Sequence, residues 1–270
     1  MTTTQLRSHV RHAATGTASH SVARVGLVAR GVIYLLIGWV ALMLALGKDN
    51  KEADQRGALQ VLAGKPHGSL LLWLVAGGLA AYALWRISEA AFGVTGEGDG
   101  AGARLKSLFR GLIYGFFAVM TVGVIHGAQG SQTKQQQDVT ARVMRHTGGR
   151  WAVGIVGAAI VVVALALLSE GLRRKFEKQL NTQEMSYRTR KVVTALGVIG
   201  TVARAIVFAL AGVLVIDAAV SFNPAKARGL DGALRTLRDQ PFGPYLLGLA
   251  ALGLIVFGLY GLCEARWRRV

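Results

Sequence analysis

Apolar residues are concentrated in six stretches of about 20 residues along the chain. An α-helix rises 1.5 Å per residue, so about 20 apolar residues cover the roughly 30 Å hydrocarbon core of a bilayer. Each stretch therefore predicts a membrane-spanning helix. The six stretches cover residues 27–47, 69–92, 108–128, 151–169, 196–220 and 244–263.

The polar residues between these stretches follow a frame that occurs three times. The second apolar stretch of each unit opens at a glycine and closes 21 residues later at a glutamate, and an arginine stands 59 or 60 residues before that glutamate. Internal repeats of this kind define the architecture of a chain. Two spans per unit give the three copies the same orientation, related by an axis along the membrane normal. The framing residues are Arg30, Gly68 and Glu89; Arg110, Gly149 and Glu170; and Arg204, Gly243 and Glu264.

A short segment before each framing glycine has helical spacing of its apolar residues. In the first unit these are Ala58, Leu59 and Leu62, followed by Lys65-Pro66-His67-Gly68. Proline and glycine end a helix, so each unit carries a short amphipathic helix on the outer surface. The third unit repeats the ending as Gln240-Pro241-Phe242-Gly243, whereas the second is less apolar and has Thr147 at the proline position.

These patterns predict an all-α integral membrane fold with six transmembrane helices. They form three parallel-repeated hairpins with short outer amphipathic helices. We place the repeats at residues 21–95, 100–180 and 195–270, after a mobile cytoplasmic tail at residues 1–20.

The composition agrees with a membrane location. Only 17% of the residues are charged, against about 25% in soluble domains, and 52% are hydrophobic. The net charge of +17 is better explained by the positive-inside rule than by nucleic acid. Of the 31 Lys and Arg residues, 19 lie on the side of the N-terminus and 12 on the other. We therefore expect a multi-pass plasma-membrane protein with both termini in the cytoplasm, no cleaved signal peptide and no nucleic-acid partner.

The residues that frame the repeat are also the candidates for chemistry. A cation at a helix N-terminus and an anion at a helix C-terminus each oppose the helix dipole by about 0.3–1 kcal/mol, and a glutamate near hydrocarbon is costly. Pairing the arginine with the glutamate removes both costs. We therefore predict three ion pairs, within or between units: Arg30 with Glu89, Arg110 with Glu170, and Arg204 with Glu264. They either gate a central path or clamp the inner end of each hairpin.

Asp217 is a second kind of candidate because it breaks the repeat. Its counterparts in the other units are Met43 and Gly123. An acid inside a membrane span indicates a functional site, but Asp217 lies close to the outer end of its span, where it also reaches water. Both interpretations stay open.

No pattern of an enzyme or a cofactor site is found. The sequence lacks a phosphate-binding glycine loop, a His/Cys ligand set and the H-E-x-x-H pattern, and the single cysteine, Cys263, excludes an internal disulfide. We expect no catalytic residues, no cofactor and no bound metal.

The repeat resembles the actinobacterial membrane family called domain of unknown function 1206, in which a two-helix unit occurs three times. The resemblance covers the chain from about residue 21 to 270. It depends on the positions of Arg30, Gly31 and Tyr34, of Pro66 and Gly68, of Tyr82 and Trp85, and of Glu89, with their counterparts. The second unit departs most, with Val163 and Ala166 at the aromatic positions. The resemblance implies fold and location and no activity.

Two classes of function fit these features. The first is a non-enzymatic membrane scaffold or accessory subunit, because few polar residues line the spans. The second is a small solute or ion transporter or channel along a pseudo-threefold path, with the Arg/Glu ring at its cytoplasmic end. The expected partners are the bilayer, anionic lipids at the basic segment 173–191, and other membrane proteins. A solvated topogenic loop is the alternative interpretation of that segment.

Overall fold

The computed structural model describes residues 17–48, 51–92, 101–128 and 130–268. Within these ranges it is helical, apart from an isolated antiparallel bridge between Leu180 and Arg268. Six helices of the described ranges are long and apolar enough to cross a membrane. They are α2 (Thr17–Ala45), α4 (Gly68–Phe92), α5 (Ala101–Ile125), α7 (Gly149–Leu172), α8 (Tyr187–Val220) and α10 (Gly243–Trp267).

The predicted all-α fold with six spans and three repeats is therefore confirmed. Because α2 begins at Thr17, residues 17–20 belong to this helix, although we expected them in the tail. The rest of that tail, residues 1–16, lies outside the described ranges.

Short helices precede the second span of each repeat, as the spacing predicts. They are α3 (Gln55–Ala63), α6 (Gln132–Met144) and α9 (Gly229–Arg238). The apolar faces of α3 and α9 are buried, with Leu59 and Leu234 almost fully covered. The more polar α6 buries only Met144. We call the end of the protein that carries these helices the short-helix end, and the end that carries the framing arginines and glutamates the charged end.

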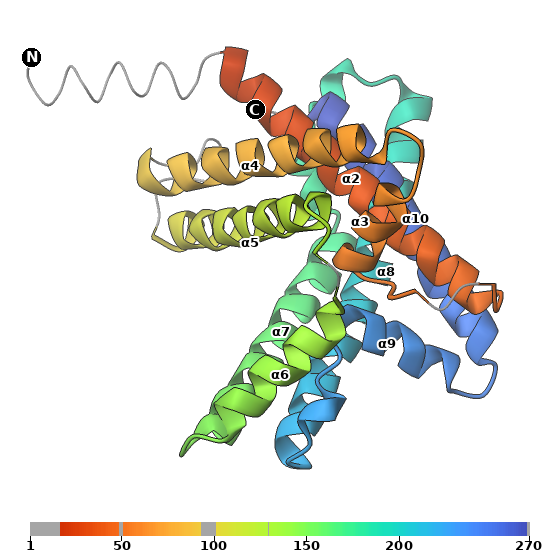
Figure 1. The fold of residues 1–270 in the computed structure, drawn as a ribbon. Coiled ribbons are helices and arrows are strands. Elements are labelled where there is room, and N and C mark those ends of the chain that lie inside the picture. Colours follow the sequence, from red (N-terminus) through yellow and green to blue (C-terminus); the bar gives the residue numbers. More distant parts are fainter. Residues whose placement is uncertain (1–16, 49–50, 93–100, 129, 269–270) are drawn as a thin grey trace, which may run out of the picture.

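The long helices pack mainly between repeats. The glutamate-bearing helix of each repeat lies along the arginine-bearing helix of the next: α4 on α5, α7 on α8, and α10 on α2 (Figure 1). The last pair connects the third repeat back to the first. The chain thus forms a cyclic series of three helix pairs between repeats, while within the first and third repeats α2 also contacts α4 and α8 contacts α10.

Small residues at equivalent positions let the backbones of each pair approach closely. A Cβ atom on Gly31 would lie 2.9 Å from the carbonyl oxygen of Gly258, and one on Gly38 would lie 2.9 Å from that of Ala251. These residues stand one and eight positions after the arginine, and six and thirteen before the glutamate. The corresponding contacts elsewhere join Gly111 to the Ala83 carbonyl (3.2 Å) and Gly212 to the Gly157 carbonyl (3.1 Å). Small residues favour this contact because apolar surface gains little from leaving lipid.

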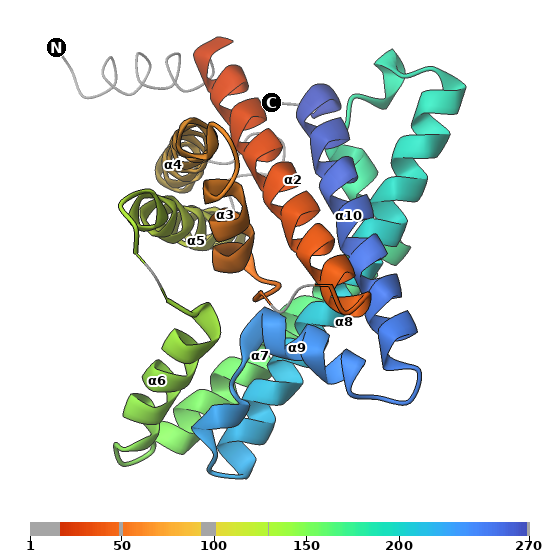
Figure 2. The same cartoon turned by 45° about the vertical axis from the view of Figure 1, so that its right-hand side comes forward.

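The three helix pairs do not share one axis. α4 and α5 run to one side of the molecule in Figure 1 and are seen nearly end-on in Figure 2, where α2 and α10 lie in the plane of the picture.

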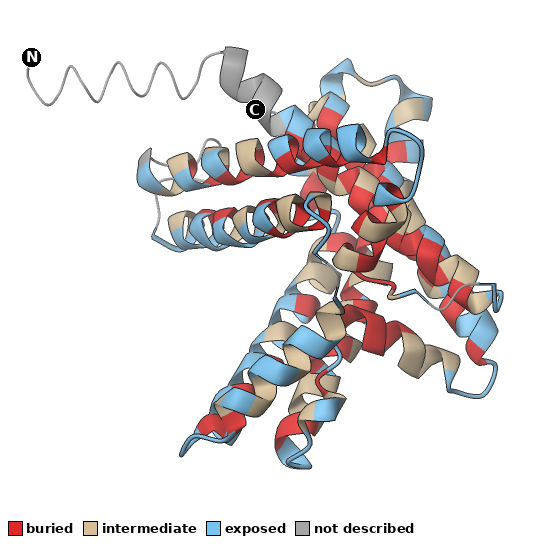
Figure 3. Cartoon of the chain, in the orientation of Figure 1, coloured by how far each residue is buried: buried red, intermediate tan, exposed pale blue. Residues whose placement is uncertain are grey.

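The second repeat is the most open. Of the most apolar stretch of α7 only 17% is buried, and of that of α5 28%, against 56% for α2 (Figure 3). In the second repeat, α5 packs along α4 and α7 packs along α8. In the first and third repeats the two spans also contact each other, α2 with α4 and α8 with α10. The second repeat therefore presents the widest apolar faces to the bilayer.

Replacing a glycine at a pair contact tests this packing. We expect Gly38→Leu to lower the free energy of unfolding by about 1–3 kcal/mol, because the side chain meets the backbone of Ala251 and Ile255. Gly77→Leu on α4 is the matched control, since a Cβ atom there meets nothing within 4 Å. Thermal unfolding of the purified proteins in one detergent gives the comparison. Equal losses in both variants would contradict the packing.

Candidate functional site

The charged end brings Arg30 and Glu264 together across the α2/α10 pair. Arg30 Nη2 lies 2.5 Å from Glu264 Oε2, and the two side chains are 13% and 6% exposed. Arg268 directly follows the last residue of α10, and its Nη1 pairs with the other carboxylate oxygen. Glu264 is thus held by guanidinium groups of the first and the third repeat, which offsets the cost of burying its charge.

Glu89 is paired within its own helix. Arg86 Nη1 donates to Glu89 Oε2 at 2.7 Å, and Ser107 Oγ on α5 donates to the same oxygen at 3.3 Å. Arg86 also donates from Nε and Nη2 to the hydroxyl oxygen of Tyr82, at 3.0 and 2.8 Å. The Arg30–Glu89 pair predicted from the sequence is therefore not formed, since a cation three residues away takes its place.

Arg204 is surrounded by aromatic rings. Its guanidinium carbon lies 4.8 Å from the ring centres of Phe208 and Phe257 and 5.3 Å from that of Tyr34. Cation–π attraction stabilises a guanidinium at these distances. Arg204 Nε is buried and has no hydrogen-bond partner among the described residues. The predicted pairing of Arg204 with Glu264 is replaced by this cage, because Glu264 is held by Arg30 and Arg268.

Arg110 and Glu170 lie apart on helices that pack elsewhere. Arg110 is on α5, which lies along α4, and Glu170 is on α7, which lies along α8. Both are half-buried, and within the described ranges no hydrogen bond or ion pair is recorded for either. The packing of α5 and α7 on different neighbours explains why the predicted Arg110–Glu170 pair is not formed.

Aromatic residues recur at fixed sequence distances from the framing arginines and glutamates. The fourth residue after each framing arginine is Tyr34, Tyr114 or Phe208. Tyr34 meets Phe257 edge-on with ring centres 4.7 Å apart, and Tyr114 meets Tyr82 in the same way at 4.6 Å. Phe257 and Tyr82 both stand seven residues before a framing glutamate. The α2/α10 and α4/α5 pairs are therefore equivalent in their contacts, and the third pair has Val163 in place of the ring.

Asp217 lies in the last turns of α8 and is about half exposed. Its carboxylate pairs with Lys226 Nζ at 2.9 Å, in the short helix η3 (Pro224–Lys226) that follows. The lysine and the exposure agree with the interpretation in which this acid reaches the membrane surface.

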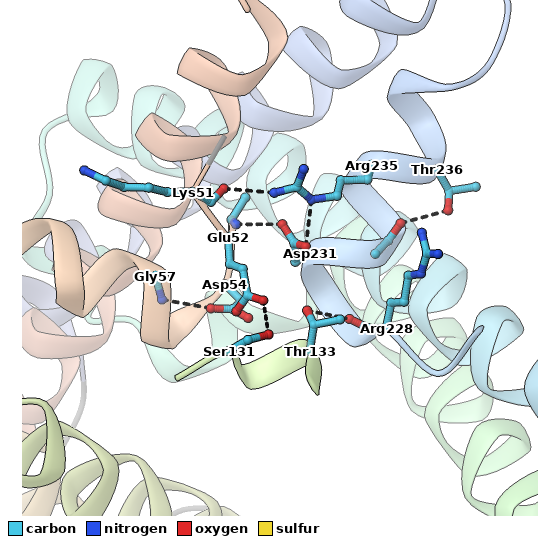
Figure 4. A network of polar contacts seen from close by, with 12 residues as sticks. Lys51, Glu52, Asp54, Gly57, Ser131, Thr133, Arg228, Asp231, Arg235 and Thr236 are labelled. Carbon is cyan, nitrogen blue, oxygen red and sulfur yellow. Dashed lines mark hydrogen bonds and ion pairs between the residues drawn. The ribbon is translucent and has the colours of Figure 1, made fainter. Parts of the chain in front are cut away.

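A second polar cluster joins the three repeats at the short-helix end (Figure 4). The Ala53 N–H donates to Asp231 Oδ1 at 2.9 Å, which connects the first repeat to the third. The Gln132 N–H donates to Glu52 Oε2 at 2.9 Å, which connects the second to the first. Thr133 Oγ1 donates to the carbonyl oxygen of Arg228 at 3.4 Å, which closes the ring from the second to the third. The sequence analysis missed this cluster, because its bonds depend on how the loops fold together.

Asp54 in this cluster caps α3 and is almost fully buried. Its Oδ1 accepts from the Gly57 N–H at 2.9 Å. Burial raises the pKa of Asp54 to about 7, and the charges of Glu52 and Asp231 act in the same direction, although the Gly57 hydrogen bond opposes the shift. The signal in the sequence was an N-cap residue before an apolar helical run.

The basic segment 173–191 is folded against the charged end. It contains two short 3-10 helices, η1 (Lys175–Gln179) and η2 (Thr182–Glu184). Phe176 and Leu180 are buried, and the Asn181 N–H donates to the carbonyl oxygen of Trp267 at 2.7 Å. Its cations point outward; those exposed are Arg173, Arg174, Lys175, Lys178, Arg188, Arg190 and Lys191.

Three repeats, six apolar helices and a charged cluster shared between repeats define a multi-pass membrane protein. The chain belongs to the family described as Domain of Unknown Function (DUF1206), which matches it three times, over residues 25–93, 105–174 and 199–268. It is similar to the "Uncharacterized protein YxxB" of Bacillus subtilis (strain 168), with 33% identity over 250 residues, covering 92% of this chain and 90% of the relative. No solved structure matches the chain.

We expect the three framing glutamates to contribute unequally to the free energy of unfolding. Glu264→Gln leaves Arg30 and Arg268 buried without their counter-charge, so we expect a loss of about 3–5 kcal/mol. Glu170→Gln is the matched control and should change stability little. Denaturant titration in detergent, followed by helix content, measures both. A larger loss for Glu170→Gln than for Glu264→Gln would contradict the assignment.

The raised pKa of Asp54 predicts a pH dependence of stability. The folded state binds this proton more tightly than the unfolded chain, so stability is present below about pH 4 and is lost as pH rises towards 7. Asp54→Asn keeps the cap and removes the titration, so its melting temperature should vary less between pH 5 and 8. The exposed Asp239→Asn is the control. A wild-type profile that Asp54→Asn leaves unchanged would contradict the assignment.

Proposed function

We propose that this protein is a non-enzymatic scaffold or accessory subunit of the plasma membrane. The proposal rests on the binding partners of the buried carboxylates at the charged end. Glu264 and Glu89 are 5% and 7% exposed, and each is bound by guanidinium groups of the same chain. The Arg30–Glu264 pair joins α2 to α10, and Glu89 reaches α5 through Ser107, so these carboxylates support a clamp between helices in preference to a gate.

The ring of hydrogen bonds at the short-helix end supports the same conclusion. It joins the three repeats through hydrogen bonds that involve Glu52, the buried Asp231 and Thr133. Both ends of the protein are thus fixed by contacts between repeats. A rigid body with wide apolar faces on α5 and α7 is suited to packing beside other membrane proteins.

Transport is the alternative, and one observation favours it. Arg110 and Glu170 are half-buried and form no ion pair with another residue of the described ranges, which suits contact with a charged solute. A path also needs a polar cavity between the spans. One cavity of the described residues lies at the short-helix end, between α6, the start of α7 and residues 222–224.

The distribution of cations supports the orientation that we propose. The charged end carries the larger share of Lys and Arg, including the exposed set of segment 173–191. By the positive-inside rule, we propose that this end, with both termini, lies in the cytoplasm. We also propose that this segment lies against anionic lipids, each cation near the surface contributing about 1 kcal/mol. The burial of Phe176 and Leu180 fixes it to the protein.

An ion-flux assay with the protein reconstituted in vesicles separates the two functions. A scaffold gives no flux above that of empty vesicles, for wild type and Glu170→Gln alike. A flux that wild type supports and Glu170→Gln abolishes would contradict the scaffold and establish the transporter. The substitution leaves the recorded ion pairs at the charged end intact, so a loss of flux is not explained by a loss of those pairs.

A further inference from the structure

A cavity of about 750 Å³ opens at the short-helix end of the second repeat. It lies between the end of α6, the first turn of α7 and the segment that follows α8. Its lining contains three residues that carry or can carry positive charge, Arg145, His146 and Arg150, and it contains no aspartate or glutamate. The local potential therefore favours an anion.

Both arginines of this cavity are particular to the second repeat. Aligned on the framing glycines, Arg145 and Arg150 correspond to Gly64 and Ser69 in the first repeat and to Asp239 and Pro244 in the third. A comparison within one chain thus separates the cavity from the shared fold. The repeat itself does not require cations here.

The backbone is open at the same place. The residue before the second span is His67 in the first repeat and Phe242 in the third, both with positive φ, and it is Gly148 in the second. A Cβ atom on Gly148 would meet nothing within 4 Å. Gly148 also gives the start of α7 no side-chain cap. The missing side chain leaves room beside the two arginines.

Two exposed aromatic residues place the cavity at the membrane surface. Trp151 is 75% exposed and Phe222 60% exposed, and both line the cavity. Arg150 lies over the ring of Phe222, 5.7 Å from its centre. The apolar stretch of α7 begins at Trp151, and aromatic residues of this kind mark the level of the lipid headgroups. Phosphate groups of lipids lie at this depth.

We propose that this cavity binds a phosphate group, held by the guanidinium groups of Arg145 and Arg150. A guanidinium donates two parallel hydrogen bonds to a phosphate, which suits arginine better than lysine for this contact. Because the cavity lies at the level of the lipid headgroups, we assign the phosphate to the headgroup of an anionic phospholipid. The acyl chains of this lipid then lie along the exposed face of α7. This site is separate from the basic segment 173–191, which lies at the opposite end of the helices.

Native mass spectrometry of the full-length protein with added phosphatidylglycerol tests the proposal. We expect Arg145→Gln/Arg150→Gln to retain one fewer lipid, with an affinity at that site lower by about tenfold or more. Arg142→Gln is the matched control, because Arg142 is an exposed cation of α6 outside the cavity. Both arginines are exposed, so equal melting temperatures in the absence of lipid are expected and exclude a folding defect.

Inorganic phosphate and phosphatidylcholine are the comparison ligands. Weaker retention of the zwitterionic phosphatidylcholine supports an anionic lipid site. A second outcome is that wild type and the double variant bind phosphatidylglycerol equally, but inorganic phosphate stabilises only wild type. This outcome supports a phosphate site whose ligand is a soluble phosphate. Equal binding of phosphatidylglycerol and of inorganic phosphate by wild type and the double variant would overturn the proposal.

Discussion

Close contact between small residues holds the six long helices together. In each pair, the helix that ends at a framing glutamate meets the helix that carries the arginine of the next repeat, through Gly31 and Gly258 or their counterparts. In lipid, burying apolar side chains against each other gains little, so backbone approach and dispersion contacts determine which helices associate. The cyclic order of the repeats follows from this contact.

The charges depend on that packing. Once α10 lies along α2, the arginine of the first repeat and the glutamate of the third are at the same depth, and Arg30 and Glu264 neutralise each other. An unpaired charge at this depth is costly, whereas a paired one restricts the register of the two helices. In the other two pairs the framing residues have other partners: Glu89 pairs with Arg86 on its own helix, and Arg204 lies among aromatic rings.

The spans, the repeats and the short helices α3 and α9 could be predicted from the sequence, because the length of an apolar stretch and its helical spacing depend on local residues. It did not determine which helices pair. The interval between arginine and glutamate is nearly constant in all three units, and it fits a pair within a repeat as well as one between repeats. Two of the observed ion pairs have helical spacing in the sequence: Arg86 with Glu89 at i+3, and Glu264 with Arg268 at i+4. Such pairs are favoured over a pair between the two spans of a repeat, because they need no contact between helices. The hydrogen bonds of Glu52 and Asp231 depend on how the loops fold together, whereas the Asp54 cap on Gly57 is local and follows from the sequence.

Disulfide cross-linking within one chain tests the cyclic packing most directly. In a Cys263→Ser background, cysteines that replace Ala83 on α4 and Gly115 on α5 should form an intramolecular disulfide between the first and second repeats, since a Cβ atom on Gly115 lies 3.8 Å from Ala83 Cβ, as a disulfide requires. Cysteines that replace Ile113 on α5 and Val163 on α7 should not. A cross-link between α5 and α7, without one between α4 and α5, would contradict the account and indicate pairing within the repeats.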